Sequence, residues 1–121
     1  MIIIESLNYV SISVSDIENS VKFYKDMFEF DVVEKQSGSK EAVLQIGEFY
    51  LRLCQIENFS KNSRDEDFLC FTVDEDDFDD ILDEVEENSI PVVFGPENIR
   101  NGQKIVITDP DGNKIALSYG S

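Results

Sequence analysis

Residues 9–18 read Tyr9-Val10-Ser11-Ile12-Ser13-Val14-Ser15-Asp16-Ile17-Glu18. The first half of this run alternates apolar residues with serines, which is the pattern of a strand with one buried face. Ser15 then offers an N-cap with Glu18 three residues on, a signature of a helix N-terminus. Apolar residues recur at helical spacing after it, so the run predicts a strand that leads directly into a helix over residues 16–28.

The second half of the chain repeats this plan. Residues 68–73 keep the large apolar positions of residues 9–14, which indicates an internal repeat. A second amphipathic helix is predicted over residues 75–88, with Asp74 as its N-cap. The remaining strands are predicted at residues 30–35, 42–46, 49–56, 91–94, 104–108 and 114–119.

These elements predict an α+β fold of two βαβββ repeats, residues 1–60 and 61–121. Each helix must bury its apolar stripe on the sheet, so we expect a mixed, partly open barrel-like sheet with a central cleft and with the helices outside. The turn at residues 109–113 places a proline and a glycine where a tight hairpin needs them. With 121 residues, the chain is expected to form a single domain over residues 1–121.

Composition excludes several functions. The 26 acidic residues outnumber the 10 basic ones, and the formal net charge of −16 repels nucleic-acid phosphate and anionic lipid. The sequence contains no histidine, so no histidine can act as a base or a ligand. The first residues carry no basic segment or long apolar stretch, and we therefore expect a cytoplasmic protein. Cys54 and Cys70 lie in apolar runs and are expected to be structural free thiols.

The sheet face opposite the helices carries small, hydroxyl-bearing and aromatic side chains together with one arginine. Such a surface is typical of a ligand cleft, although packing against another copy or a neighbouring sheet is the alternative. The aromatic members could stack on a planar ligand while Arg52 or Glu41 fixes a polar end. The predicted ligand-binding residues are Tyr9, Ser11, Phe49, Tyr50, Arg52, Phe68, Cys70, Ala116 and Ser118.

Two runs of the sequence resemble the signatures of a known family. They are residues 9–24, which open Tyr9-Val10-Ser11-Ile12, and residues 107–117, which contain Asp109-Pro110-Asp111-Gly112-Asn113. Both are similar to the vicinal oxygen chelate superfamily, also called the glyoxalase / bleomycin resistance / dioxygenase superfamily. The resemblance covers nearly the whole chain, and it implies the same two-repeat fold and a homodimer with a cleft at its interface.

The resemblance also implies where a metal would lie. Members typically hold a divalent ion with histidine or carboxylate side chains, and by position these fall on Tyr9, Phe68 and Ala116, with Arg52 on the equivalent strand of the first half. Phenylalanine and alanine have no donor atom, arginine is a cation, and a tyrosine must lose a proton of pKa about 10. We therefore expect a vacated metal site, with no metal ligand, no cofactor and no catalytic residue.

The expected function is accordingly metal-independent binding of a small molecule, such as sequestration of a cationic or aromatic antibiotic. The first alternative is a metal-dependent lyase, isomerase or dioxygenase of the same superfamily that uses other ligands, for example Glu41, Gln45 or Glu48. The second alternative is an acidic interaction module, because the predicted second helix carries many acids and no basic residue. Its docking face would include Asp76, Asp79, Asp80 and Asp83.

Overall fold

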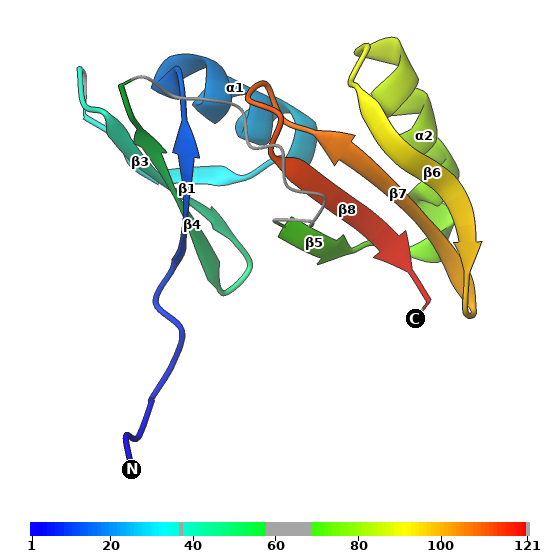
Figure 1. The fold of residues 1–121 in the computed structure, drawn as a ribbon, viewed down its shortest axis with the longest axis horizontal. Helices are drawn as coiled ribbons and strands as arrows, with labels where there is room; N and C mark the ends of the chain where they lie inside the picture. Colours follow the sequence, from blue (N-terminus) through cyan, green and yellow to red (C-terminus); the bar gives the residue numbers. More distant parts are fainter. Residues whose placement is uncertain (37, 58–68, 121) are drawn as a thin grey trace. The chain divides into compact units, whose positions relative to one another are not determined.

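The computed structural model describes residues 1–36, 38–57 and 69–120. The chain divides into two compact units, Met1–Ser60 and Lys61–Ser121. Each unit has its own sheet and its own helix (Figure 1).

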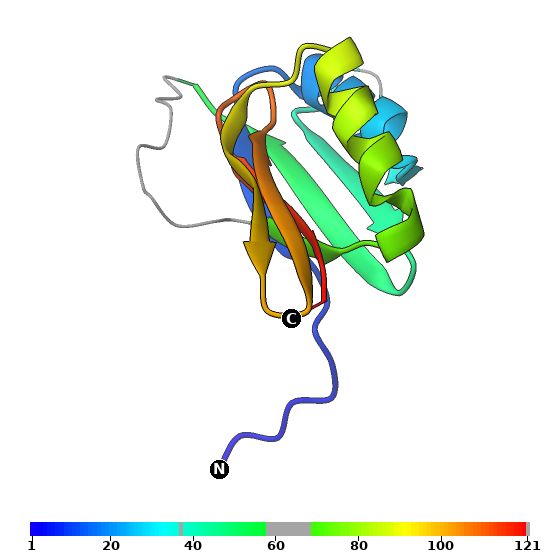
Figure 2. The ribbon, with the colours of Figure 1, turned by 90° about the vertical axis from the view of Figure 1, so that its right-hand side faces the viewer.

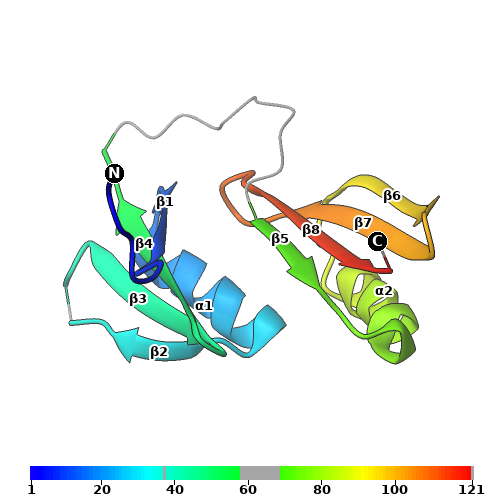
Figure 3. The ribbon, with the colours of Figure 1, turned by 90° about the horizontal axis from the view of Figure 1, so that it is seen from below.

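Unit 1 contains β1 (Val10–Val14), α1 (Ile17–Phe28), β2 (Asp31–Glu34), β3 (Glu41–Ile46) and β4 (Phe49–Gln55). Its four strands lie in the order β1-β4-β3-β2. The pair β1–β4 is parallel and the other two pairs are antiparallel, so the sheet is mixed. Seen from below, α1 lies along one face of this sheet (Figure 3).

Unit 2 contains β5 (Leu69–Thr72), the short 3-10 helix η1 (Glu75–Asp77), α2 (Phe78–Glu87), β6 (Val92–Ile99), β7 (Gly102–Thr108) and β8 (Lys114–Tyr119). Its sheet order is β5-β8-β7-β6, with β5–β8 parallel and the other pairs antiparallel. The helix α2 runs beside this sheet (Figure 2). Unit 2 therefore repeats the topology of unit 1.

The helix α1 starts one residue later than the sequence predicts, with its N-cap at Asp16 in place of Ser15. Asp16 is its N-cap, and the carboxylate Oδ1 accepts a hydrogen bond of 3.2 Å from the backbone N–H of Asn19. The side-chain Oε1 of Gln55, on β4, accepts a second one of 2.8 Å from the N–H of Ile17. Two of the donors that a helix N-terminus leaves unpaired are thereby satisfied, one of them from the sheet.

The core of unit 1 forms between α1 and the sheet. The buried residues alternate along β1, β3 and β4, which shows that one face of these strands meets the helix, whereas β2 at the sheet edge is exposed throughout. Tyr24 is fully buried and packs against Phe23, Phe28 and Phe30, with ring centroids 5.2–6.0 Å apart. The buried strand residues are Ile12, Val14, Ala42, Leu44, Leu51 and Leu53.

The second helix differs slightly from its prediction. Asp74 caps the short helix η1, with Oδ1 accepting from the N–H of Asp76 at 2.9 Å, and α2 begins only at Phe78. Phe78 and Val85 form its buried stripe, and the Phe78 ring meets Tyr119 of β8 edge-on at 5.2 Å. The acids of this segment lie at exposed positions, as expected of a solvated helix face.

The strand β6 is longer than predicted. It continues from Val92 to Ile99 through Gly95 and Pro96, with register shifts where it pairs with β7. The predicted strand ends at Phe94, just before Gly95 and Pro96, which are residues that usually interrupt a strand. An edge strand tolerates proline because one side of it needs no ladder hydrogen bonds, and β6 lies at the edge of its sheet.

The turn between β7 and β8 is held from inside by Asp109. Its Oδ1 accepts from the backbone N–H groups of Asp111 and Asn113 at 2.9 and 2.8 Å, and its Oδ2 accepts from the Asn113 side-chain amide at 2.8 Å. All three residues are at most 5% exposed. The predicted tight hairpin is confirmed, and a buried polar network closes it.

The α+β class and the two βαβββ units are therefore confirmed. That the two repeats together form a single domain over residues 1–121 stays a prediction. Among the described residues, no helix has the length and apolar character needed to cross a lipid bilayer.

Candidate functional site

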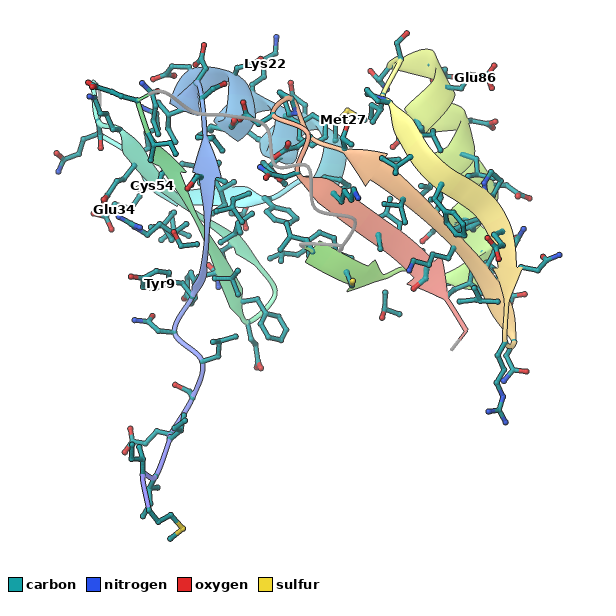
Figure 4. The ribbon with its side chains drawn as sticks, viewed as in Figure 1. Tyr9, Lys22, Met27, Glu34, Cys54 and Glu86 are labelled. Carbon is teal, nitrogen blue, oxygen red and sulfur yellow. The ribbon has the colours of Figure 1, made fainter. Side chains whose placement is uncertain are left out.

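The face of the unit 1 sheet opposite α1 carries the candidate site. Alternation along β4 directs Leu51 and Leu53 towards the helix, and therefore Tyr50, Arg52 and Cys54 to the other face. We call this second face the open face of unit 1. Figure 4 labels three of the residues around it: Tyr9 before β1, Glu34 on β2 and Cys54 on β4.

Arg52 lies at the centre of the open face, because β4 has β1 on one side and β3 on the other. Its Nη1 donates a hydrogen bond of 3.1 Å to Oγ of Ser11, the residue directly opposite it on β1. Its Nη2 donates to Oε1 of Glu41, on β3, and forms an ion pair with it. The guanidinium carbon lies 6.0 Å from the centroid of the Tyr9 ring, within cation–π range. The side chain of Arg52 thus links its own strand, β4, to the neighbouring strands β1 and β3.

The electrostatics of this cluster follow from the same contacts. The hydrogen bond to Glu41 raises the pKa of Arg52 above its ordinary value, and burial opposes this shift. The guanidinium is therefore a permanent positive charge on the open face. Its side chain is 26% exposed, whereas the Glu41 side chain is 55% exposed and so remains open to water.

The structure separates the aromatic candidates. Tyr50 lies on the open face opposite Gln45 of β3. Phe49 has the same parity along β4 as Leu51, so it lies on the face that α1 covers, near the end of the sheet, and its side chain is 65% exposed. Tyr9, Ser11, Tyr50 and Arg52 are brought together by the fold, and Phe49 is not part of this group.

The other candidate residues belong to unit 2. Cys70 on β5 lies opposite Ala116 on β8, and Thr72 lies opposite Ser118. Cys70 is exposed and Ser118 is partly buried, whereas Ala116 is only 1% exposed. Phe68 lies outside the described residues. That these residues line a ligand site stays a prediction.

A hollow of about 210 Å³ lies at the end of the β2–β3 hairpin, and Glu41, the ion-pair partner of Arg52, lines it. Glu34, Ser39 and Glu41 are among its lining residues. Glu41 is among the residues expected at the site and Glu34 is not, because a register shift between Val32 and Glu34 breaks simple alternation along β2. The pairing of Glu34 with Val43, next to Arg52, is set by that irregularity and leaves no signal in the sequence pattern.

The described residues do not fit the metal site of the family pattern. Ala116 has no donor atom, Tyr9 offers a phenol in contact with a cation, and Arg52 is itself a cation. Glu41 is engaged by Arg52, and the Gln45 amide donates to the carbonyl of Gly47 at 2.9 Å. Throughout residues 1–36, 38–57 and 69–120, no three histidine, cysteine or acidic side chains group as a metal would require. Both cysteines are free thiols.

Two βαβββ units, each with a mixed four-stranded sheet and one α-helix, place the chain in the α+β class of proteins. Residues 6–117 match the family described as the Glyoxalase/Bleomycin resistance protein/Dioxygenase superfamily, and the chain belongs to this family. The resemblance found in the sequence is therefore confirmed.

Several relatives share one name, metallothiol transferase FosB. The chain is 36% identical over 121 residues to a metallothiol transferase FosB of Staphylococcus epidermidis, covering 98% of this chain and 84% of the relative. It is 30% identical to the metallothiol transferase FosB of Staphylococcus saprophyticus, covering 98% and 79%. The crystal structure of the fosfomycin resistance protein FosX of Listeria monocytogenes superposes with a TM-score of 0.84, at 18% identity and 98% and 94% coverage, which supports the fold.

These comparisons correct the predicted function. The expectation of a metal-independent protein that binds and sequesters an antibiotic is wrong, because the relatives at 30–36% identity are metallothiol transferases. The expectation depended on Tyr9, Phe68 and Ala116 replacing the usual ligands. The loss of donors at three positions excludes only the usual coordination geometry, and it does not exclude an enzyme of the same superfamily. The first alternative, an enzyme with other ligands, is the better supported one.

Proposed function

We propose that this chain is a group-transfer enzyme of the metallothiol transferase type, which joins a thiol to a small molecule. The identity of 36% over 98% of the chain to a protein of that name carries the proposal. The metal ion that the name implies finds no fitting ligand set among the described residues. The chemistry that follows is therefore limited to what the chain's own side chains do.

The open face of unit 1 supplies binding and orientation. The Arg52 guanidinium, fixed by Ser11 and Glu41, holds a positive charge at the centre of the sheet. Tyr9 and Tyr50 flank it with aromatic rings that are 45% and 37% exposed, so both can contact a ligand. Such a surface can fix one polar group and one flat or apolar portion of a substrate, which lowers the entropic cost of bringing two reactants together.

Turnover tests the proposal directly. The purified protein would be incubated with fosfomycin and a low-molecular-weight thiol, with Mn²⁺, Ni²⁺, Zn²⁺ or Mg²⁺ added one at a time. Loss of free thiol and the mass of the adduct would be measured, with a chelator as control. We expect adduct formation above the level of a control without protein, and the chelator arm shows whether turnover needs a metal. Absence of an adduct under every condition, with no metal retained on purification, would refute the proposal.

The partners and the setting remain part of the proposal. We propose a cytoplasmic homodimer that takes a small-molecule substrate and does not bind nucleic acid or membrane, in keeping with a net charge of −16. Light scattering coupled to size-exclusion chromatography would test the oligomeric state. A mass near 13.8 kDa at all concentrations would contradict the homodimer.

A further inference from the structure

Arg52 occupies a position that stability alone does not explain. Its ion pair with Glu41 lies on an open face, and the Glu41 carboxylate is 55% exposed. Water and salt screen such a pair, so it adds little to the stability of the fold. The hydroxyl of Ser11 and the ring of Tyr9 nevertheless hold the guanidinium in place from the neighbouring strand.

The chemistry of Arg52 indicates which groups it could bind. A guanidinium presents planar N–H donors that match the oxygen atoms of carboxylates and phosphates. In the structure one carboxylate, that of Glu41, already accepts from Nη2. Glu41 borders the hollow of about 210 Å³, so its side chain has open space beside it. A competing oxyanion could therefore take its place on Arg52 without moving the sheet.

We propose that Arg52 is a specificity-determining residue that receives an anionic oxygen group of a small molecule, a carboxylate or a phosphate-like group. Glu41 is the internal counter-ion that this group displaces. The proposal rests on the proposed function only in placing the substrate on the open face of unit 1. It also accounts for an arginine on the strand where the family pattern offers a metal ligand, because the chain itself brings a positive charge there.

The negative charge of the rest of the chain limits which anions can bind at Arg52. The formal net charge of −16 repels anions at long range, so an anion must gain from a direct contact in order to stay. Removing the negative charge of Glu41 should strengthen anion binding, since it removes both a competitor and a repulsive charge. Removing the positive charge of Arg52 should abolish it.

Nuclear magnetic resonance of the ¹⁵N-labelled full chain tests the proposal. Sodium acetate and sodium phosphate would be titrated in separate arms at constant ionic strength, and the Arg52 side-chain Nε–H and the Ser11 amide would be followed. We expect saturable shifts at both groups in at least one arm. The arm with the tighter binding identifies whether a carboxylate or a phosphate-like group is preferred.

Variants separate the outcomes. Arg52→Gln should lose the saturable shifts. Glu41→Gln should bind the anion about threefold more tightly, because an exposed ion pair no longer competes for Arg52. The controls Lys22→Gln and Glu86→Gln should bind the anion as the wild type does. Lys22 lies on α1, which packs on the opposite face of the unit 1 sheet, and Glu86 lies on α2 of unit 2 (Figure 4). Each of these substitutions changes the net charge by one unit, as Arg52→Gln and Glu41→Gln do. Non-saturable shifts in the wild type, or saturable shifts that persist in Arg52→Gln, would overturn the proposal.

Two further readings keep the test decisive. If Arg52→Gln does not fold, as judged by circular dichroism, Glu41→Gln alone decides, and an unchanged anion affinity in that variant overturns the proposal. Anion binding without any turnover would contradict the proposed transferase function and leave the inference standing. Turnover without anion binding at Arg52 would support the proposed transferase function and overturn the inference about Arg52.

Discussion

The buried turn between β7 and β8 gives the sharpest stability prediction. Asp109 is 3% exposed and accepts three hydrogen bonds, two from backbone N–H groups and one from the Asn113 side chain. A hydrogen bond to a charged group contributes about 1.5–3 kcal/mol, and an unpaired buried donor costs about 1–3 kcal/mol. Because these terms are not additive, we expect Asp109→Ala to lower the free energy of unfolding by about 3–5 kcal/mol.

A second substitution at the same position tests the reasoning behind that magnitude. Asp109→Asn keeps an oxygen for the two backbone donors but places an amide opposite the Asn113 amide. It should therefore lose about one of the three hydrogen bonds, at about 1–2 kcal/mol. The exposed Asp83→Ala on α2 is the control and should change stability by no more than about 0.5 kcal/mol.

Urea denaturation followed by circular dichroism measures these differences. The three variants and the wild type should share one slope against urea, because the surface exposed on unfolding does not change. The expected order of stability is wild type and Asp83→Ala together, then Asp109→Asn, then Asp109→Ala. If Asp109→Ala unfolds within about 1 kcal/mol of the wild type, the three hydrogen bonds do not stabilise the turn as argued.

Three further substitutions probe the local structure. Asp16→Ala removes the side-chain acceptor for the Asn19 N–H and should cost about 1 kcal/mol in urea denaturation, whereas Asp16→Asn should cost less. Phe78→Ala empties a site that is 1% exposed and should cost about 3–5 kcal/mol, and a loss below about 1 kcal/mol would show that α2 does not need this anchor. Gly102→Ala would press a Cβ atom into the backbone of Tyr119, so we expect a lower melting temperature, and an unchanged one would contradict the tight approach of the two strands.

Much of the fold could be predicted from the sequence because it depends on local patterns. Strict alternation before Ser15 predicts β1, and the side chains of Asp16 and Asp74 begin the two helical segments that apolar spacing predicts. The extent of β6 could not be predicted in the same way. Only its place at the sheet edge, which is a property of the tertiary structure, permits Pro96 within the strand.

The candidate site was predicted less completely. Alternation correctly groups Ser11, Tyr50 and Arg52 on one face. Phe49 was added to the candidates as an aromatic residue that could stack on a ligand, but it is one residue out of phase with them on β4. Glu34 was not predicted, because only a register shift in β2 pairs it with Val43, the residue of β3 that lies opposite Arg52. The function was predicted wrongly because the argument used the residues absent from the usual metal positions, and an absence at known positions carries no information about the rest of a site.

In each unit, the strand that comes first in the sequence pairs in parallel with the strand that comes last, and this pairing affects the order of folding. In unit 1, Ser11 pairs with Arg52, 41 residues further along the chain, whereas β3 and β4 are joined by a short turn. Contacts between distant segments form late in folding because loop closure costs entropy before any contact is gained. During synthesis, β1 therefore leaves the ribosome first but must wait for β4, and hydrogen exchange in refolding experiments should protect the hairpin amides before those of β1.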